Sequence, residues 1–136
     1  MKKLTIPFIF ILIGILLITG CKSAEKQEEQ FQETAEKEAN VVFGEEFIMF
    51  LSEGNFQKAT EYLDSAIKDD LPATKLENKW NKLEEELGNF KKQEYDKTEK
   101  IDDYDVIYIN GQFEKGNAYF QIKLNQNEKI TSFEIS

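Results

Sequence analysis

The chain contains no histidine, no arginine and only one cysteine among its 136 residues. Without histidine there is no imidazole general base, no Ser-His-Asp arrangement and no imidazole metal ligand. Without arginine there is no planar fork for bidentate binding of a carboxylate or a phosphate. A single cysteine forms neither an intramolecular disulfide nor a thiolate zinc site. The remaining reactive side chains are Asp, Glu, Tyr, Lys, Ser and Thr, and this small inventory favours a protein that is not an enzyme.

Basic residues are scarce relative to acidic ones. The chain has 17 lysines against 26 aspartates and glutamates, which gives a formal net charge of −9. Such a chain repels nucleic acid and anionic lipid head groups. Its seven glycines are scattered, and none opens the strand–helix unit of a phosphate-binding loop. We therefore expect no nucleic-acid partner and no cofactor.

The longest apolar run covers residues 4–19, directly after Lys2 and Lys3. A membrane span needs about 20 apolar residues to cross a hydrocarbon core of about 30 Å. This run is shorter, contains Pro7 and has no basic cluster after it, which disfavours an uncleaved membrane anchor. A basic start, an apolar middle and small residues at the end are typical of a secretory signal peptide.

Residues 18–21, Ile-Thr-Gly-Cys, resemble the lipobox of bacterial lipoproteins. That pattern consists of a branched apolar residue, a small residue, Gly or Ala, and an obligate cysteine. The resemblance implies that residues 1–20 are a signal peptide and that Cys21 carries a diacylglycerol on its sulfur. It also implies that the protein is lipid-anchored at the extracytoplasmic face of the cell membrane.

Residues 21–40 form an acidic segment in which Phe31 is the only large apolar side chain. Such a composition cannot bury enough apolar surface to fold alone, so we interpret the segment as a tether between the lipid and a folded domain. Its Ala, Glu, Lys and Gln content favours helix, and both helix and coil stay open here. Because cleavage removes two lysines and no acid, the net charge falls from −9 to −11. Acyl chains, rather than electrostatic attraction, must then hold the protein to the membrane.

From residue 41 onwards, apolar residues recur at helical spacing and predict three helices. Gly54 ends the first helix and Asn55 caps the second. Pro72 fits the first turn of the third helix, and Gly88 ends it. The three apolar faces consist of Phe43, Phe47, Phe50 and Leu51; of Phe56, Ala59, Leu63 and Ala66; and of Leu76, Trp80, Leu83 and Leu87.

After Gly88 the apolar period changes to two, which predicts four strands. The first, residues 90–101, is polar and is expected at an edge of the sheet. Short turns between consecutive strands require an antiparallel meander. The third strand directs Tyr119, Gln121 and Lys123 outward. The expected inward residues are Ile107, Ile109, Phe113, Ala118, Phe120, Ile122, Leu124, Phe133 and Ile135. We therefore predict an α+β domain over residues 41–136, with three N-terminal helices packed on a four-stranded antiparallel sheet.

The spacing of glycines and core residues resembles an uncharacterised bacterial domain family over about residues 41–136. That family occurs in short envelope lipoproteins and ahead of some α/β-hydrolase domains, and it is similar to cystatin-like and nuclear-transport-factor-2-like cones. The resemblance implies a curved sheet closed on one side by helices, with an apolar pocket at the open end, and it provides no active-site residues. The residues that carry it are Phe47, Leu51, Gly54, Phe56, Ala59, Leu63, Asp64, Leu71, Pro72, Leu76, Trp80, Gly88, Phe90, Phe113–Gly116 and Glu128–Ile130.

Related cones use their pocket either for catalysis by a carboxylate beside a tyrosine or as a binding site. The resemblance therefore implies Tyr62, Trp80, Tyr108 and Tyr119 as candidate pocket residues, with Asp64 as the nearest carboxylate in sequence. For three of these residues the sequence also allows a purely structural explanation. Trp80 lies on a core stripe, Tyr62 suits a site with its hydroxyl at the surface, and Asp64 suits a solvated helix position.

Acidic residues cluster at Glu99, Asp102, Asp103 and Asp105. Calcium loops of the Asp-x-Asp-x-Asp-Gly type need a glycine-assisted turn, and Tyr104 interrupts the spacing here. We expect an acidic turn between two strands, and no metal site.

Three functional classes remain after these exclusions. We expect a non-catalytic binding domain that recognises an envelope protein, a peptide or a small apolar ligand at the membrane surface. One alternative is a cone-type hydrolase or isomerase that uses a pocket carboxylate and a tyrosine. The other alternative is an immunity or exclusion lipoprotein that protects its own cell.

Overall fold

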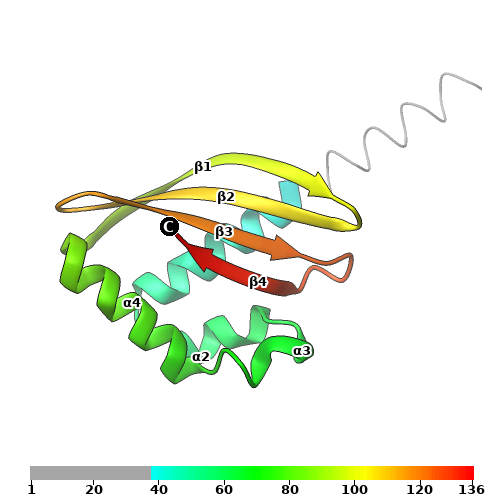
Figure 1. The fold of residues 1–136 in the computed structure, drawn as a ribbon, viewed down its shortest axis with the longest axis horizontal. Coiled ribbons are helices and arrows are strands. Elements are labelled where there is room, and N and C mark those ends of the chain that lie inside the picture. Colours follow the sequence, from blue (N-terminus) through cyan, green and yellow to red (C-terminus); the bar gives the residue numbers. More distant parts are fainter. Residues whose placement is uncertain (1–37) are drawn as a thin grey trace, which may run out of the picture.

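The computed structural model describes residues 38–136. Helices come first and strands follow, which confirms the α+β class (Figure 1). The signal peptide, Cys21 and the tether up to residue 37 lie outside the described residues. The elements are helix 38–52, α2 (Phe56–Ala59), the short 3₁₀ helix η1 (Thr60–Tyr62), α3 (Ser65–Lys68), α4 (Ala73–Leu87), β1 (Phe90–Ile101), β2 (Tyr104–Phe113), β3 (Asn117–Leu124) and β4 (Ile130–Ile135).

The four strands pair in the order β1-β2-β3-β4, and every pair is antiparallel. This meander and the edge position of β1 confirm the sequence prediction. Ile109 pairs with Phe120 in the register, so their side chains lie on the same face of the sheet. Helix 38–52 and α4 both cover that face: a side chain on Gly44 would contact Ile109, and the ring of Trp80 stacks on Phe120.

Helix 38–52 starts before the expected domain boundary at residue 41. Residues 38–40 are already helical, and Asn40 is buried against β2. The helix ends at Gly54 as expected, because Gly54 has a φ of +75°, which glycine adopts without steric penalty. The N–H of Asn55 then donates to the carbonyl oxygen of Phe50 at 2.8 Å, which closes the helix end.

The predicted second helix, whose apolar face was expected to run from Phe56 to Ala66, is wrong as one continuous element. It divides into α2, η1 and α3, because Leu63 is extended and forms a parallel bridge with Ile130 at the start of β4. Asp64 then begins α3 by accepting a hydrogen bond from the N–H of Ala66 at 2.9 Å. Ala66 is consequently exposed instead of lying on an apolar stripe. Pairing with a distant strand has overridden the local helical pattern.

α4 and the sheet enclose the core. Leu76 and Trp80 are the buried residues of α4, and Gly88, with a φ of +79°, ends the helix as predicted. Pro72 is the cap immediately before the first turn. On β2, a Cβ atom at Gly111 would lie only 2.4 Å from the ring of Phe120. Because Gly111 has no side chain, that ring can pack directly over the backbone of β2.

Candidate functional site

The interior expected to form a cone pocket is filled by aromatic rings around Trp80. Trp80 is only 3 % exposed. Its ring centroid lies 5.4 Å from that of Phe90, 5.7 Å from Phe113 and 5.9 Å from Phe120. These separations are those of packed aromatic pairs. Trp80 therefore belongs to the core, as its place on the apolar stripe of the third predicted helix indicated. It does not line a ligand pocket.

Tyr62 lies on the helical side of the molecule and forms a pair with a carboxylate that the sequence did not indicate. Its hydroxyl donates to Oε2 of Glu46 at 2.7 Å, and its ring packs against Phe43 and Phe50. Burial, followed by the hydrogen bond to Glu46 and that residue's charge, raises the pKa of Tyr62 to about 12. A tyrosine held in its protonated form is a hydrogen-bond donor and a poor base.

Asp64 has both carboxylate oxygens engaged in structural hydrogen bonds. Oδ1 accepts from the N–H of Ala66, and Oδ2 accepts from Nδ2 of Asn125 at 2.9 Å. Its own N–H donates to the carbonyl oxygen of Ile130. Asp64 thus ties α3 to the β3–β4 connection. It does not pair with Tyr62, whose partner is Glu46, so the two residues do not form the acid–tyrosine site that the cone resemblance suggested.

The Tyr62–Glu46 pair should be visible in an alkaline titration. Because the pKa of Tyr62 is raised from 10.0 to about 12, the stability that this contributes is fully present below pH 10 and is lost as the pH rises through 12. We expect the ultraviolet titration curve of the native protein, minus that of Tyr62→Phe, to show one phenolate with a midpoint near pH 12. Glu46→Gln should move that midpoint down. A difference curve centred near pH 10 would show that the pair does not form.

Tyr108 and Tyr119 lie on the face of the sheet that points away from the helices. Their chain neighbours Ile107 and Phe120 are fully buried, and side chains alternate between the two faces of a strand. Tyr119 is 52 % exposed. We call this surface the outer face. By strand register it comprises Lys92, Glu94, Lys97, Glu99, Ile101, Tyr104, Val106, Tyr108, Asn110, Gln112, Asn117, Tyr119, Gln121, Lys123, Ser132 and Glu134.

The structure therefore does not bring the five candidate pocket residues together. Trp80 is in the core, Tyr62 and Asp64 lie among the short helices, and Tyr108 and Tyr119 lie on the outer face. Tyr119 does point outward, as the alternation along its strand predicted. The physical reason for the separation is the sheet itself, because its two faces cannot contribute to one cavity.

Two tyrosines of the outer face are held by charged neighbours. Nζ of Lys97 lies 2.7 Å from Oε1 of Glu99 and 4.8 Å from the centroid of the Tyr108 ring. The Tyr108 hydroxyl donates to Oε2 of the same glutamate at 3.1 Å. The hydrogen bond to Lys97 lowers the pKa of Glu99, while burial and then Glu99 raise the pKa of Tyr108. Nearby, Nζ of Lys123 lies 4.2 Å from the Tyr104 ring centroid. Each of the two rings thus has one cation–π contact, worth about 0.5–1 kcal/mol at an exposed site.

The outer face is charge-balanced, although the whole chain carries a net charge of −9. Its charged side chains are three lysines, Lys92, Lys97 and Lys123, and three glutamates, Glu94, Glu99 and Glu134. Lys92 and Glu94 form one further ion pair at 3.2 Å. Balanced charge around the exposed Tyr119 and the half-buried Tyr104 and Tyr108 makes this face less repulsive to an acidic partner than the rest of the chain would be.

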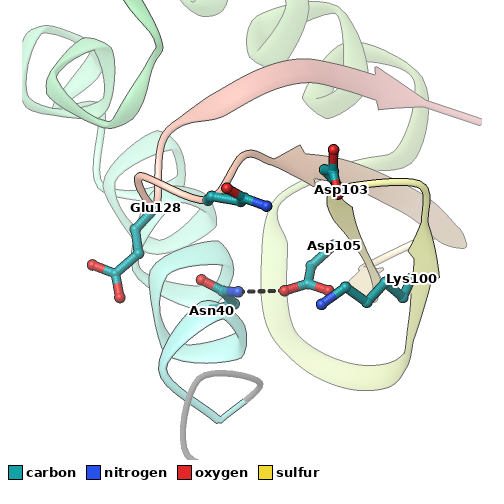
Figure 2. A pocket seen from close by; sticks show the side chains of 6 residues that line it. Asn40, Lys100, Asp103, Asp105 and Glu128 are labelled. Atoms are coloured by element: carbon teal, nitrogen blue, oxygen red, sulfur yellow. Dashed lines mark hydrogen bonds between the residues drawn. The ribbon is translucent and has the colours of Figure 1, made fainter. Parts of the chain in front are cut away.

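A polar pocket of about 350 Å³ lies where helix 38–52 meets the β1–β2 and β3–β4 connections (Figure 2). Its acidic residues Asp103 and Asp105 belong to the cluster noticed in the sequence. Sequence reasoning missed Asn40, because the composition assigned it to the tether. A signal was present, since Asn40 precedes Gly44 by one helical turn on the buried side. The pocket is lined by Asn40, Lys100, Asp103, Asp105, Gln126 and Glu128.

Within residues 38–136, no three acidic, cysteine or histidine side chains gather as a group able to hold a metal ion. None of the helices in residues 38–136 is long and apolar enough to cross a membrane.

Residues 44–133 match the family described as "Protein of unknown function (DUF3887)". The chain matches no curated protein and no solved structure. The family match agrees with the resemblance to an uncharacterised domain family over about residues 41–136. It does not bear on the lipoprotein and cone relationships, which stay predictions.

Proposed function

Because the chain belongs to the DUF3887 family of proteins of unknown function, we propose a function from its own residues. It is a non-catalytic binding module of the cell envelope, anchored by lipid on Cys21 at the extracytoplasmic face of the membrane. Its outer face recognises a protein or an extended peptide. The observation that carries this proposal is Tyr108, in a cation–π contact with Lys97 and diagonally across the β2–β3 pair from the exposed Tyr119, on a sheet face that the described helices leave uncovered.

Tyrosine on a sheet face is well suited to recognition. Antiparallel sheets commonly expose one face to water, so exposure alone is ordinary. Here, however, the face presents Tyr104, Tyr108 and Tyr119, and tyrosine supplies a large contact area with little loss of side-chain entropy. Lys97 and Lys123 hold two of the rings before any partner arrives. Such pre-organisation lowers the entropic penalty of binding.

A protein or peptide partner has more support than a small apolar ligand. The space between the helices and the sheet contains Trp80 and the phenylalanine rings packed against it, so the described interior offers little room for an apolar guest. The catalytic alternative also has less support, because each carboxylate oxygen of Asp64 accepts a structural hydrogen bond and the raised pKa of Tyr62 keeps its hydroxyl protonated. The arrangement of helices on one face of a four-stranded meander supports the proposed relationship to nuclear-transport-factor-2-like cones.

A photo-crosslinking experiment in intact cells tests the outer face. A photoreactive phenylalanine replaces Tyr119 in the full chain, and the control carries it at Lys79, an exposed residue on α4. We expect one discrete protein adduct from position 119 and none from position 79. Tyr108→Ala in the crosslinking chain should lower the adduct yield by roughly tenfold, since truncating an aromatic anchor costs more than about 1 kcal/mol of binding energy.

Two results would contradict the proposal. One is an equal set of adducts from positions 119 and 79, which would reflect crowding at the membrane. The other is an adduct from position 119 that Tyr108→Ala leaves unchanged, since the two tyrosines belong to the same proposed surface.

A further inference from the structure

The Asn40 side chain carries a buried acceptor without a partner. Asn40 is only 6 % exposed, and its Nδ2 donates to Oδ2 of Asp105 at 2.6 Å. Within residues 38–136, its Oδ1 accepts no hydrogen bond. The carboxylate of Asp105 only accepts hydrogen bonds, so the amide must turn its nitrogen towards Asp105 and its oxygen the other way. Buried acceptors in folded proteins nearly always accept a hydrogen bond, so we expect a bound molecule to supply the donor here.

Figure 2 shows what surrounds that oxygen. The nitrogen of Asn40 faces Asp105, while the oxygen lies on the side of Glu128. Three carboxylates, those of Asp103, Asp105 and Glu128, line the pocket against the single ammonium group of Lys100. The volume of about 350 Å³ is at the lower end of small-molecule sites, which span roughly 300–1,000 Å³.

The lining determines the chemistry of the occupant. A simple anion would be repelled by the three carboxylates. None of the described residues that line the pocket is apolar, so an apolar molecule would find no partner among them. A bare metal ion fits poorly, because the described residues bring no three acidic ligands into one metal-binding group. A primary ammonium group fits, since it carries positive charge and three N–H donors.

We propose that this pocket binds a small molecule through a primary ammonium group, which donates to Oδ1 of Asn40 and to the carboxylate of Glu128. Lys100, in the same lining, accepts a carboxylate of that molecule as its ion partner. The ligand class is thus an amino acid or the amino end of a short peptide. The site is separate from the outer face, because Asp105 pairs with the buried Leu124 on the sheet side that faces the helices.

Matched small molecules test this inference on the full chain, purified in detergent and labelled with ¹⁵N. Glycine supplies both charged groups, ethylamine only the ammonium, acetate only the carboxylate, and trimethylglycine the same charges without N–H donors. We expect saturable shifts of the Asn40 side-chain amide signals with glycine, and weaker binding of ethylamine. Acetate and trimethylglycine should give no saturable shift.

Two variants connect the binding to the proposed contacts. Asn40→Leu removes the acceptor, and it should weaken glycine binding at least tenfold, read from the backbone signals of Asp105 and Glu128. Glu128→Gln changes an exposed side chain and should weaken glycine binding several-fold without altering the fold. Glu77→Gln, an exposed position on α4, is the matched control and should bind like the unchanged chain.

The inference fails if glycine and ethylamine produce no saturable shift, or if trimethylglycine binds as well as glycine, because N–H donors would then be irrelevant. Saturation by calcium chloride with no response to the amines would overturn it in favour of a cation site. Unchanged affinity in Glu128→Gln would also overturn it, since that variant leaves the buried residues intact.

Discussion

Replacing Trp80 by alanine should lower the free energy of unfolding by about 3–5 kcal/mol, the range for emptying a large aromatic site in a core. Trp80 is 3 % exposed and its ring contacts those of Phe90, Phe113 and Phe120. Three packed aromatic rings cannot collapse into the vacated volume without leaving their own contacts, so a cavity must remain. Because Trp80 is the single tryptophan, denaturation should be followed by far-ultraviolet circular dichroism.

The neighbouring Lys79 provides the control for this measurement. It lies on the same helix but is exposed, so Lys79→Ala should change the free energy of unfolding by less than about 0.5 kcal/mol. Small domains have only about 5–15 kcal/mol of total stability, so the Trp80→Ala protein should be visibly labile at moderate temperature. A loss below about 1 kcal/mol would mean that the aromatic cluster does not support the fold.

Elements with strong local patterns were predicted accurately from the sequence. β1 covers the predicted residues 90–101, and α4 ends at Gly88 as expected. In α4 a regular apolar period is bounded by a glycine, whereas the polar β1 is marked by the change of period after that glycine. Gly54 acts in the same way at the end of helix 38–52. Local periodicity and glycine chemistry together determine these boundaries.

The segment from Phe56 to Ile67 could not be predicted in this way. Its apolar spacing suits a helix, but Leu63 leaves the helix to pair with Ile130, and Asn125 binds Asp64 across the same connection. Both partners are more than 60 residues away, as the Asn125–Asp64 separation of 61 positions shows. A local window contains no information about contacts at that distance, so tertiary structure overrode propensity here.

The candidate site residues also differ in whether a local sequence pattern could predict their positions. The alternation of side chains along β3 predicted that Tyr119 points outward, whereas the cone resemblance implied that it lines a pocket. The structure agrees with the alternation. The Lys97–Tyr108 and Lys123–Tyr104 contacts needed the strand register, which the sequence does not specify. The acidic composition around Asn40 led us to assign it to the tether. Its spacing of seven residues from Phe47, about two helical turns, nevertheless places it on the buried face of the helix.

Replacing Cys21 by alanine should abolish the incorporation of a palmitate analogue and release the protein from the membrane fraction. The expectation rests on the lipobox at residues 18–21, since Cys21 itself lies outside the described residues. Cleavage would remove Lys2 and Lys3 with the leader, so the remaining chain would carry a net charge of −11. Anionic head groups would repel such a chain.

Two acyl chains are sufficient for this attachment. Each buried methylene contributes about 0.8 kcal/mol; a single chain binds reversibly, whereas two chains anchor a protein stably without a basic patch. The unchanged chain should therefore sediment with membranes and carry the label, and Ser23→Ala, which leaves the lipobox intact, should behave like it. If Cys21→Ala and the unchanged chain incorporate the label equally, the thiol is not the lipid acceptor and the proposed anchor is wrong.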